Sequence, residues 1–410
     1  MAVRCRLCAE PACHVFADLG ATPLANAFLR PEQLSEIEPL YPLRVLLCHA
    51  CFLVQLDALV DPDALFGRYA YFTSYSDTLV ANAKAYAEMM TRRLGLTPHD
   101  RVIEVASNDG YLLQHFLANG MNVFGIEPAA NVAQAAREKG IPTIVRFFGS
   151  AAASELAAQG QQARLIVANN VLAHVPDIND FISGVRILLQ PGGVVTLEFH
   201  HLLSLIAKHQ FDVIYHEHFQ YFSLATARAA LASHGLAVVD VEEIPAEGGS
   251  LRVYARHQGD ATEAVSARVA DVLAKEEAAG LRTLAPYHTF AARITKTKLG
   301  LLSFLRGARQ AGKSVVAYGA AAKGNTLLNS CGVRADLVDY AVDRSPHKQG
   351  LFLPGSHIPV HAPERVLETR PDYLLILPWN LREEIMEQMS PIRRWGGQFV
   401  VPIPEVQILP

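Results

Sequence analysis

The sequence predicts an α/β protein made of a cysteine-rich N-terminal module followed by two α/β domains. Two cysteine pairs lie near the N-terminus, short apolar stretches alternate with helical stretches from residue 101, and the alternation restarts at residue 314. Strands that alternate with helices are typical of a parallel sheet, whose ligands bind at the carboxyl ends of the strands. We place the three units at residues 1–70, 71–285 and 286–410.

Composition and charge exclude several classes of protein. The 410 residues suffice for two or three domains with their own cores, and a formal net charge of −4 gives no case for binding nucleic acid or anionic membranes. The N-terminus leaves no room for a signal peptide, and no apolar run is long enough to span a bilayer. We expect a cytoplasmic protein, and self-contained domains of this size predict a monomer.

The N-terminal unit carries two CxxC motifs about 40 residues apart, Cys5 with Cys8 and Cys48 with Cys51. Tetrahedral zinc favours four thiolates, and each short turn directs two sulfurs at one point. Because four thiolates leave no open position, we expect a structural zinc ion. The alternatives are free cysteines in two turns, or a redox pair, although neither motif opens a helix after a core strand. Cys13 is the spare cysteine, and His14 and His49 are possible substitute ligands.

The first α/β domain ends its strands with polar residues. Strands are predicted at 102–106, 123–128, 165–170 and 194–198, and the first leads into a turn without the GxGxxG of dinucleotide folds. S-adenosylmethionine (SAM) has no pyrophosphate to cradle, so this turn favours SAM over NAD. Glu127 suits the two hydroxyls of a ribose, although polar strand ends also serve solubility and helix capping. The predicted SAM-binding residues are Glu104, Ser107, Asn108, Asp109, Gly110, Glu127, Pro128, Asn169 and Asn170.

An acid/base cluster follows the predicted cofactor site. Tyr215, Glu217 and His218 stand within four residues, together with His216. Such groups exchange protons once their pKa values are tuned, so they suit removal of a proton beside a carbonyl and alkylation of the resulting carbanion. On a strand, His216 and His218 would face the same way, so either could instead be a core histidine. We interpret three further histidines as serving the fold or solubility: His200, His201 and His209.

The second α/β domain begins after a helical stretch at about 263–311, which residues 286–288 are expected to divide into two helices. Strands are predicted at 314–319, 337–343 and 373–377. The first turn is rich in small residues, which let a backbone approach a phosphate at a helix start, but it is not a Walker A loop. The alternative is a remnant of a dinucleotide fold that binds nothing. The predicted nucleotide-sugar contacts are Lys323, Asn325, Asp343 and Arg344.

The chain resembles the SAM-dependent sugar C-methyltransferases that act on nucleotide-linked 4-keto-deoxysugars, over essentially its whole length. The motifs that carry the resemblance are the two cysteine pairs and residues 71–76, 104–110, 169–174, 215–219, 248–252, 319–325 and 377–380. The resemblance implies an N-terminal zinc-binding module, a central Rossmann-like methyltransferase domain and a C-terminal Rossmann-like domain. Two positions depart from the family pattern: Ala106 replaces a frequent glycine, and Glu247 replaces a frequent histidine.

The resemblance also implies a reaction, the methylation of C-3 of a nucleotide-linked 4-keto-6-deoxyhexose. The ketone acidifies the C-3 hydrogen, and we expect His218 to remove it while Tyr215 and His174 donate hydrogen bonds to the oxyanion. Glu217 would orient an imidazole or contact a sugar hydroxyl, and Tyr75 would bridge the zinc module to the pocket. The alternatives are an NAD-dependent nucleotide-sugar oxidoreductase or epimerase, and a non-catalytic zinc-containing binding protein. The nucleotide base, the C-3 substituent and the stereochemistry stay open.

Overall fold

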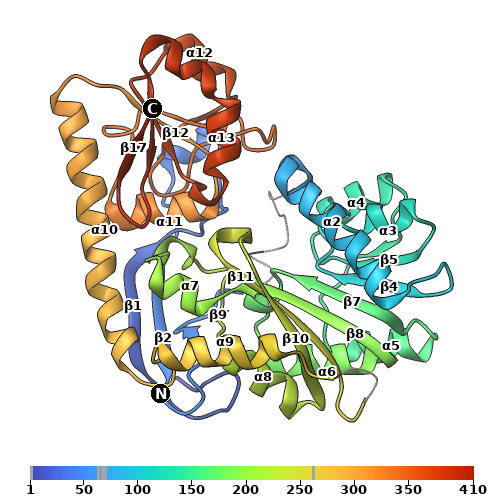
Figure 1. The fold of residues 1–410 in the computed structure, drawn as a ribbon. Coiled ribbons are helices and arrows are strands. Elements are labelled where there is room, and N and C mark those ends of the chain that lie inside the picture. Colours follow the sequence, from blue (N-terminus) through green and yellow to red (C-terminus); the bar gives the residue numbers. More distant parts are fainter. Residues whose placement is uncertain (1–2, 62–64, 66–71, 261–263) are drawn as a thin grey trace.

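The computed structural model describes residues 3–61, 65, 72–260 and 264–410. Within them, sheets of four, seven and six strands organise the chain (Figure 1). The predicted α/β fold class, with a cysteine module followed by two Rossmann-like units, is confirmed. The proposed boundary at 70/71 and Tyr71 of the first resemblance motif lie outside the described residues.

The N-terminal sheet is antiparallel and borrows its last strand from the middle of the chain. Its order is β1 (Ala12–Thr22), β2 (Tyr41–Cys48), β3 (Val54–Leu56) and β9 (Gln220–Tyr221), and a short 3-10 helix, η1 (Pro31–Ser35), lies in the β1–β2 connection. Strand β9 pairs with β3 through Val54 opposite Tyr221 and Gln55 opposite Gln220. The cysteine module and the acid/base segment are therefore joined by a backbone ladder.

The central sheet has the order β10-β11-β8-β7-β4-β5-β6. Its parallel strands are β4 (Arg101–Val105), β5 (Asn122–Ile126), β6 (Thr143–Ile144), β7 (Ala163–Asn169) and β8 (Leu189–His200). Two antiparallel strands that we did not predict extend it, β10 (Leu236–Ile244) and β11 (Ser250–His257). Helices cover both faces, so β4 and β7 are largely buried and have an apolar middle, with polar residues near their ends.

Helices of the central unit alternate with its strands. They are α2 (Asp77–Leu94), α3 (Leu113–Ala118), α4 (Ala130–Glu138), α5 (Ser150–Ala158), α6 (Ile178–Leu188), α7 (Leu202–Ala207), α8 (Leu224–Ser233) and α9 (Ala267–Ala278). Single 3-10 turns are η2 (Thr73–Tyr75), η3 (Leu172–His174), η4 (Phe211–Val213) and η5 (Ala246–Gly248). Ser76 caps α2, since its hydroxyl accepts a hydrogen bond from the Leu79 N–H, and Gly95 ends the helix with φ 58°.

The C-terminal sheet has the order β14-β13-β12-β15-β16-β17 and is parallel except for β17. The strands are β12 (Val315–Tyr318), β13 (Ala341–Val342), β14 (Val360–His361), β15 (Tyr373–Ile376), β16 (Gln398–Val401) and β17 (Gln407–Leu409). The helices are α11 (Ala322–Cys331), α12 (Glu364–Thr369) and α13 (Arg382–Gln388), with η6 (Trp379–Leu381) and η7 (Ser390–Trp395). The strand predicted from residue 337 starts only at Ala341, because Leu337 and Val338 turn back to the Arg334 carbonyl.

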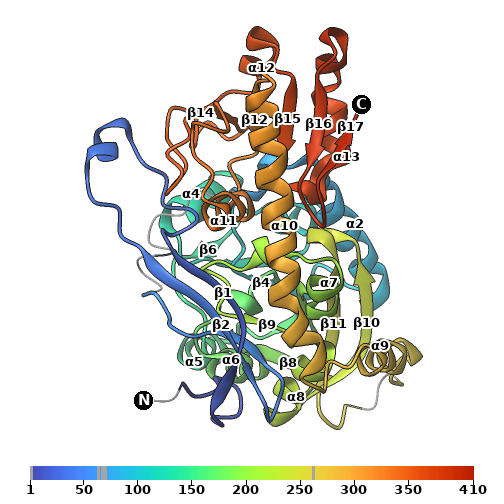
Figure 2. The same cartoon turned by 90° about the vertical axis from the view of Figure 1, so that its left-hand side faces the viewer.

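A long helix, α10 (Ala285–Gln310), connects the N-terminal sheet with the C-terminal unit (Figures 1 and 2). Its buried face includes Phe290, which stacks on Phe16 of β1 with ring centroids 4.6 Å apart, and Leu305. The predicted break at 286–288 is displaced: α9 ends at Ala278, and Pro286 lies in the first turn of α10, where a missing N–H costs nothing. No described helix combines the length and apolarity needed to cross a membrane.

Candidate active site

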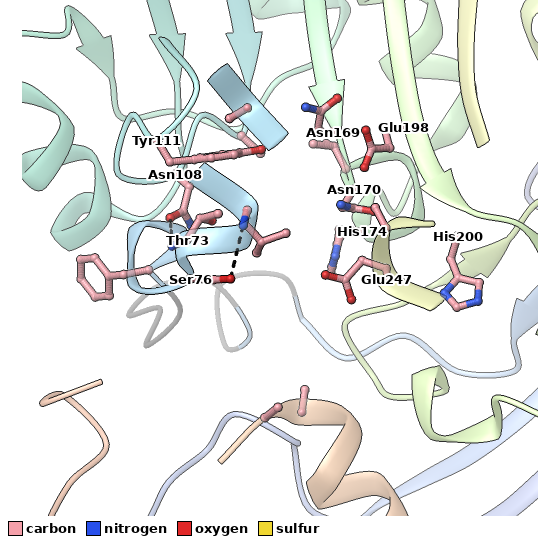
Figure 3. Close-up of a pocket in the computed structure, with 18 of the residues that line it drawn as sticks. Thr73, Ser76, Asn108, Tyr111, Asn169, Asn170, His174, Glu198, His200 and Glu247 are labelled. Atoms are coloured by element: carbon pink, nitrogen blue, oxygen red, sulfur yellow. Dashed lines mark hydrogen bonds between the residues drawn. The ribbon is translucent and has the colours of Figure 1, made fainter. Parts of the chain in front are cut away.

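A cavity of about 1030 Å³ lies where the central and C-terminal units face each other. Its wall is formed by the carboxyl ends of β4, β5, β7 and β8, the start of α2, the turn that carries His218, and the loops after β12, β13 and β15. Ligand pockets usually span ~300–1,000 Å³, so this cavity is large enough for a cofactor and a second ligand. Figure 3 shows Thr73 and Asn108 on one side of it and Asn170, His174 and Glu247 on the other.

The first turn of the central unit has an unusual backbone. Ala106 has φ 52° and Asn108 has φ 49°, and at the end of β7 Asn170 has φ 55°. All three line the cavity, and non-glycine residues with positive φ concentrate at functional sites because the surrounding fold must hold them there. The Asn108 amide oxygen accepts a hydrogen bond from the Thr73 N–H (2.9 Å), which fixes η2 against this turn (Figure 3).

Glu127, at the end of β5, is held rigidly in the cavity wall. One carboxylate oxygen accepts a hydrogen bond from the Asn108 N–H and the other from the Ala129 N–H, both at 2.9 Å. Burial raises the pKa of Glu127 to about 7, against the lowering effect of these two hydrogen bonds. Each oxygen keeps a lone pair for a ribose hydroxyl. Pro128, Asn169 and Asn170 line the same cavity.

Four other predicted cofactor residues lie behind this wall: Glu104, Ser107, Asp109 and Gly110. Gly110 is required there, since a Cβ would lie 2.2 Å from the Ile141 side chain and φ is 77°. Burial and two neighbouring carboxylates hold the pKa of Glu104 well above its usual range.

Several buried polar atoms around this turn lack a hydrogen-bond partner among the described residues. They are Glu104 Oε2, Ser107 Oγ, Asp109 Oδ1 and Asn169 Oδ1. Buried polar atoms are otherwise almost always satisfied, so an unpartnered atom at the cavity wall, here Asn169 Oδ1, indicates a missing ligand or water, while the other three lie directly behind the wall. The turn therefore fits a bound SAM molecule.

The acid/base segment is a turn that follows η4 and not a strand. His216 and His218 consequently point in different directions. His216 is 1% exposed, and its Nε2 lies 3.2 Å from the Tyr41 carbonyl oxygen in the N-terminal sheet. His218 and Tyr215 line the cavity.

The hydrogen bonds of His218 define its tautomer. Nδ1 lies 2.7 Å from the Val213 carbonyl oxygen, which only accepts, so Nδ1 carries the proton. Nε2 then accepts a hydrogen bond from the Tyr215 hydroxyl at 2.7 Å. Burial, reinforced by His174, holds the pKa of His218 well below its usual value. His218 is therefore neutral at neutral pH, and its lone pair, on Nε2, is engaged by the Tyr215 hydroxyl at the cavity wall.

His174 lies beside His218, with ring centroids 4.7 Å apart. Burial lowers the pKa of His174 to about 4, opposed by a hydrogen bond to the Glu217 backbone. The Glu217 carboxylate does not reach the cavity: it is 2% exposed and accepts hydrogen bonds from Asn26 Nδ2 at 2.7 and 2.9 Å. Tyr75 lies at the rim, where its hydroxyl is 3.4 Å from His347 Nε2 and so reaches the C-terminal unit instead of the cysteine module.

The structure adds cavity residues that the sequence interpretation missed. His200, interpreted as serving the fold or solubility, lines the cavity, and so do Glu198 and Arg252, whose charged groups lie 3.0 Å apart. Glu198 and His200 end a predicted strand, so the strand-end argument that selected Asn169 would have found them. Arg252 lies on β11, an antiparallel strand that no parallel-sheet pattern predicts.

The predicted contacts of the C-terminal unit separate into two groups. Lys323, Asp343 and Arg344 line the cavity. Asn325 does not, because it is 1% exposed and donates a hydrogen bond to the Ala25 carbonyl at 2.6 Å. Lys323 forms an ion pair with Glu247, the position where the chain departs from the family pattern.

The four predicted zinc ligands converge on one point. The sulfur atoms of Cys5, Cys8, Cys48 and Cys51 all lie within 4.8 Å of one another, with Cys5 to Cys51 at 3.4 Å and Cys8 to Cys48 at 3.6 Å. Sulfurs of a tetrahedral zinc site with Zn–S bonds of about 2.3 Å lie roughly 3.8 Å apart, so the arrangement fits zinc. His14 and His49 are outside this group of atoms, and the side chain of Cys13 is not described.

The cysteine site is tied to the acid/base segment by Arg6, which stands between Cys5 and Cys8. Its guanidinium donates hydrogen bonds to the carbonyl oxygens of Phe219 (3.0 Å) and Leu56 (2.7 Å). Together with the β3–β9 pairing, these bonds fix the backbone next to His218.

Comparison with known proteins covers nearly the whole chain. Family models match residues 5–66 ("Putative zinc binding domain"), 79–241 ("Methyltransferase domain") and 245–404 ("C-methyltransferase C-terminal domain"). The chain is 37% identical to C-methyltransferase NovU of Streptomyces niveus over 405 residues, which is 99% of this chain and 96% of NovU.

Solved structures resemble only part of the chain. The magnesium protoporphyrin IX methyltransferase ChlM of Synechocystis PCC 6803 with bound SAM covers 44% of this chain and 81% of its own at 16% identity, with a TM-score of 0.33. The glycopeptide N-methyltransferase MtfA with SAM covers 43% and 94% at 17% identity, with a TM-score of 0.34. Likenesses this weak carry no argument about the site.

Proposed function

This chain belongs to the family of SAM-dependent C-methyltransferases, and we propose that it methylates C-3 of a nucleotide-linked 4-keto-6-deoxyhexose. The observation that carries this proposal is the pairing of Tyr215 with a neutral His218 in the wall of a cavity that also contains the strand ends of the SAM site. A base beside the methyl donor is what alkylation of a carbon next to a ketone requires.

In the proposed reaction His218 Nε2 takes the C-3 proton, and the electron pair of the C–H bond becomes an enolate with its charge on the C-4 oxygen. The Tyr215 hydroxyl turns from His218 to that oxygen and stabilises it. His174, whose ring centroid lies 4.7 Å from that of His218 in the same cavity wall, is the second proposed donor to this oxygen. When bound, SAM supplies the methyl group that C-3 attacks.

The low pKa of His218 limits how the site can work. A neutral imidazole is available to accept a proton, but a weak base needs strong stabilisation of the enolate. The buried Glu217 carboxylate accepts two hydrogen bonds from Asn26, and Glu217 precedes His218 in the chain, so these bonds hold the backbone that carries the base. We therefore assign Glu217 a positioning role without contact to the sugar.

The nucleotide part of the substrate is assigned to the C-terminal unit. The first turn of α11 offers N–H groups to a phosphate, and Arg344 brings positive charge to the cavity wall. Ser345, 4% exposed, also lines the cavity, and its hydroxyl has no hydrogen-bond partner among the described residues. A four-thiolate site suits a reducing compartment, so we propose a cytoplasmic enzyme that acts as a monomer.

The test combines transfer and exchange. Incubation with methyl-labelled SAM and a panel of dTDP-, GDP- and CDP-4-keto-6-deoxyhexoses is expected to place the label on C-3 of at least one sugar. In deuterated water without SAM, the same sugar is expected to exchange its C-3 hydrogen. A methyl label at another carbon, or on oxygen, would contradict the proposal. Methyl transfer without deuterium exchange at C-3 under any condition would exclude a free enolate intermediate.

A further inference from the structure

One group of side chains in the cavity has no part in the reaction proposed above. His200, Glu247 and Lys323, here called the polar triad, come from the end of β8, from η5 and from α11, and all three line the cavity. The triad shares the cavity wall with the proposed base, His218. Figure 3 shows Glu247 and His200 on the same side of the cavity as His174.

The tautomer of His200 follows from its neighbour Gln210. Gln210 Nε2 lies 3.0 Å from the Gly248 carbonyl oxygen, so this atom is the amide nitrogen and the other is the oxygen. That oxygen lies 2.6 Å from His200 Nε2, which must therefore carry the proton. Burial, then Lys323, lowers the pKa of His200 to about 3, so the ring is neutral. Its Nδ1 is a hydrogen-bond acceptor.

Glu247 is held in place by a strained turn. Its φ is 53°, and the next two residues are glycines with φ 91° and 131°. A Cβ on Gly248 would lie 2.3 Å from the Trp379 ring, so the turn is packed directly against the C-terminal unit. Lys323 is the main cause of a lowered pKa of Glu247, which keeps the carboxylate charged.

Lys323 completes the triad with a limited number of donors. Its ammonium has three N–H groups, of which one bonds Glu247 and one bonds Asn380 Oδ1 at 3.2 Å. One N–H remains. The ion pair neutralises both charges, so the triad offers a sugar two acceptors and one donor with no net charge.

We propose that the polar triad recognises a neutral hydroxyl group on the carbon that is methylated, and that it selects such a sugar over one with an amino group there. This inference rests on the proposed function. A hydroxyl can donate to His200 or Glu247 and accept from Lys323, so both its donor and its acceptor find partners. A protonated amine also finds acceptors, but it meets the Lys323 charge and finds no uncompensated carboxylate to repay its desolvation.

The test compares two substrates in one protein. Matched nucleotide-linked 4-keto-6-deoxyhexoses with a hydroxyl or an amino group at C-3 are offered with saturating SAM, and the ratio of their kcat/KM values is measured. We expect the hydroxyl sugar to be favoured by roughly 10²-fold or more, since mismatched polar contacts in a built site give large discrimination. The ratio is independent of the folded fraction of the preparation.

Two variants test the cause of the preference. Lys323→Met leaves the Glu247 carboxylate without its counter-ion, and is expected to move the ratio at least about tenfold toward the amino sugar. Lys275→Met is the matched control, because it also removes the lysine of a lysine–glutamate pair (Lys275 with Glu243) but lies on the surface, away from the cavity. That control should keep the wild-type ratio.

The outcomes separate the two proposals. Methylation of both sugars with equal or greater efficiency for the amino sugar, or an unchanged ratio in Lys323→Met, overturns the role of the triad and leaves the C-3 methyltransferase proposal intact. Absence of both C-3 exchange and transfer with either sugar overturns the proposed function and the triad with it.

Discussion

The two Rossmann-like units share an architecture, but the carboxylates that end their second strands have different ionic partners. Glu127 in the central unit and Asp343 in the C-terminal unit both line the cavity, and each carboxylate oxygen accepts one backbone N–H, at 2.9 Å for Glu127 and 2.8 Å for Asp343. Asp343 also pairs with Lys348, whose Nζ lies 3.5 Å from Oδ2, whereas no cation among the described residues pairs with Glu127. The comparison teaches that equivalent strand ends can form different sites when only one of them carries a counter-ion.

The first turns of the two units also differ. Around the central turn, buried polar atoms such as Ser107 Oγ have no partner among the described residues. The C-terminal turn is closed by packing: a Cβ on Gly319 would lie 2.4 Å from Pro378, and Lys348 donates to the Ala320 carbonyl at 2.8 Å. This closed turn argues against the alternative of an NAD enzyme, whose ribose would need the Asp343 carboxylate.

The largest expected effect tests whether chemistry and cofactor binding are separable within the central unit. His218→Asn removes the proposed base, and we expect kcat and C-3 deuterium exchange to fall by roughly 10²–10⁴ while the Kd for SAM, measured by calorimetry, stays within about twofold. The matched control is His216→Asn, which faces the N-terminal sheet and should retain turnover per folded molecule. Equal loss in both variants would remove His218 from the base role.

The next largest effect concerns the cysteine module, whose strand β3 pairs with β9 of the central unit. Cys48→Ser is expected to lower zinc content from about one ion per chain and to lower the thermal midpoint, because metal binding is folding energy for such a site. Metal analysis and calorimetry measure both. Cys331→Ser, a buried thiol in α11 outside the metal site, should keep the metal. Unchanged zinc in Cys48→Ser would contradict the four-thiolate site.

A matched pair of variants compares the two units directly. Glu127→Gln is expected to weaken SAM binding by about 10–100-fold, since a charged acceptor of two hydroxyls is lost. Asp343→Asn should leave the SAM Kd unchanged and instead destabilise the chain by about 1–2 kcal/mol, because one oxygen can no longer accept a backbone N–H. Titration calorimetry and denaturant unfolding distinguish them. Similar SAM affinities in both variants would erase the contrast between the units.

The smallest expected effect is a change in the free energy of unfolding with pH. The folded pKa of Glu127, about 7, lies above its ordinary value of 4.5, so between these values the folded chain binds more protons than the unfolded one. Stability without SAM should therefore decrease as pH rises from about 4.5 to 7, by up to ~1.4 kcal/mol per pH unit from this group. Urea unfolding of wild type and Glu127→Gln across this range isolates the contribution. Parallel curves would show that burial does not disfavour the carboxylate.

The sequence predicted most of the architecture because periodicity and cysteine spacing are local signals. The predicted strands correspond to β4, β5, β7, β8, β12, β13 and β15, and the cysteines converge, whereas the short parallel strands β6, β14 and β16 were not predicted. Strands β10 and β11 were not predicted, since antiparallel strands at the edge of a parallel sheet lack the alternation of strands with helices that marked the others. The directions of the His216 and His218 side chains could not be predicted either. Residues 214–218 form a turn, so their side chains do not alternate between two faces as they would in a strand.

Long-range contacts account for the differences at the site. Asn325 looked exposed in a small-residue turn, but a hydrogen bond to Ala25, 300 positions away, holds it inside. Glu217 is taken from the cavity by Asn26 in the same way. Lys323 was expected at the nucleotide, and its pairing with Glu247 depends on how two units meet. No spacing within the sequence encodes these partners.

The short strand β9 limits how enzymes of this kind can be recombined. Because residues 220–221 complete a sheet whose other strands end by residue 56, a chimera with a junction between the first two units would separate a strand from its ladder. Exchange of the N-terminal module between relatives would need to carry the 211–222 segment with it, as a discontinuous unit. The junction at the start of α10 is little better, since Phe290 packs on β1.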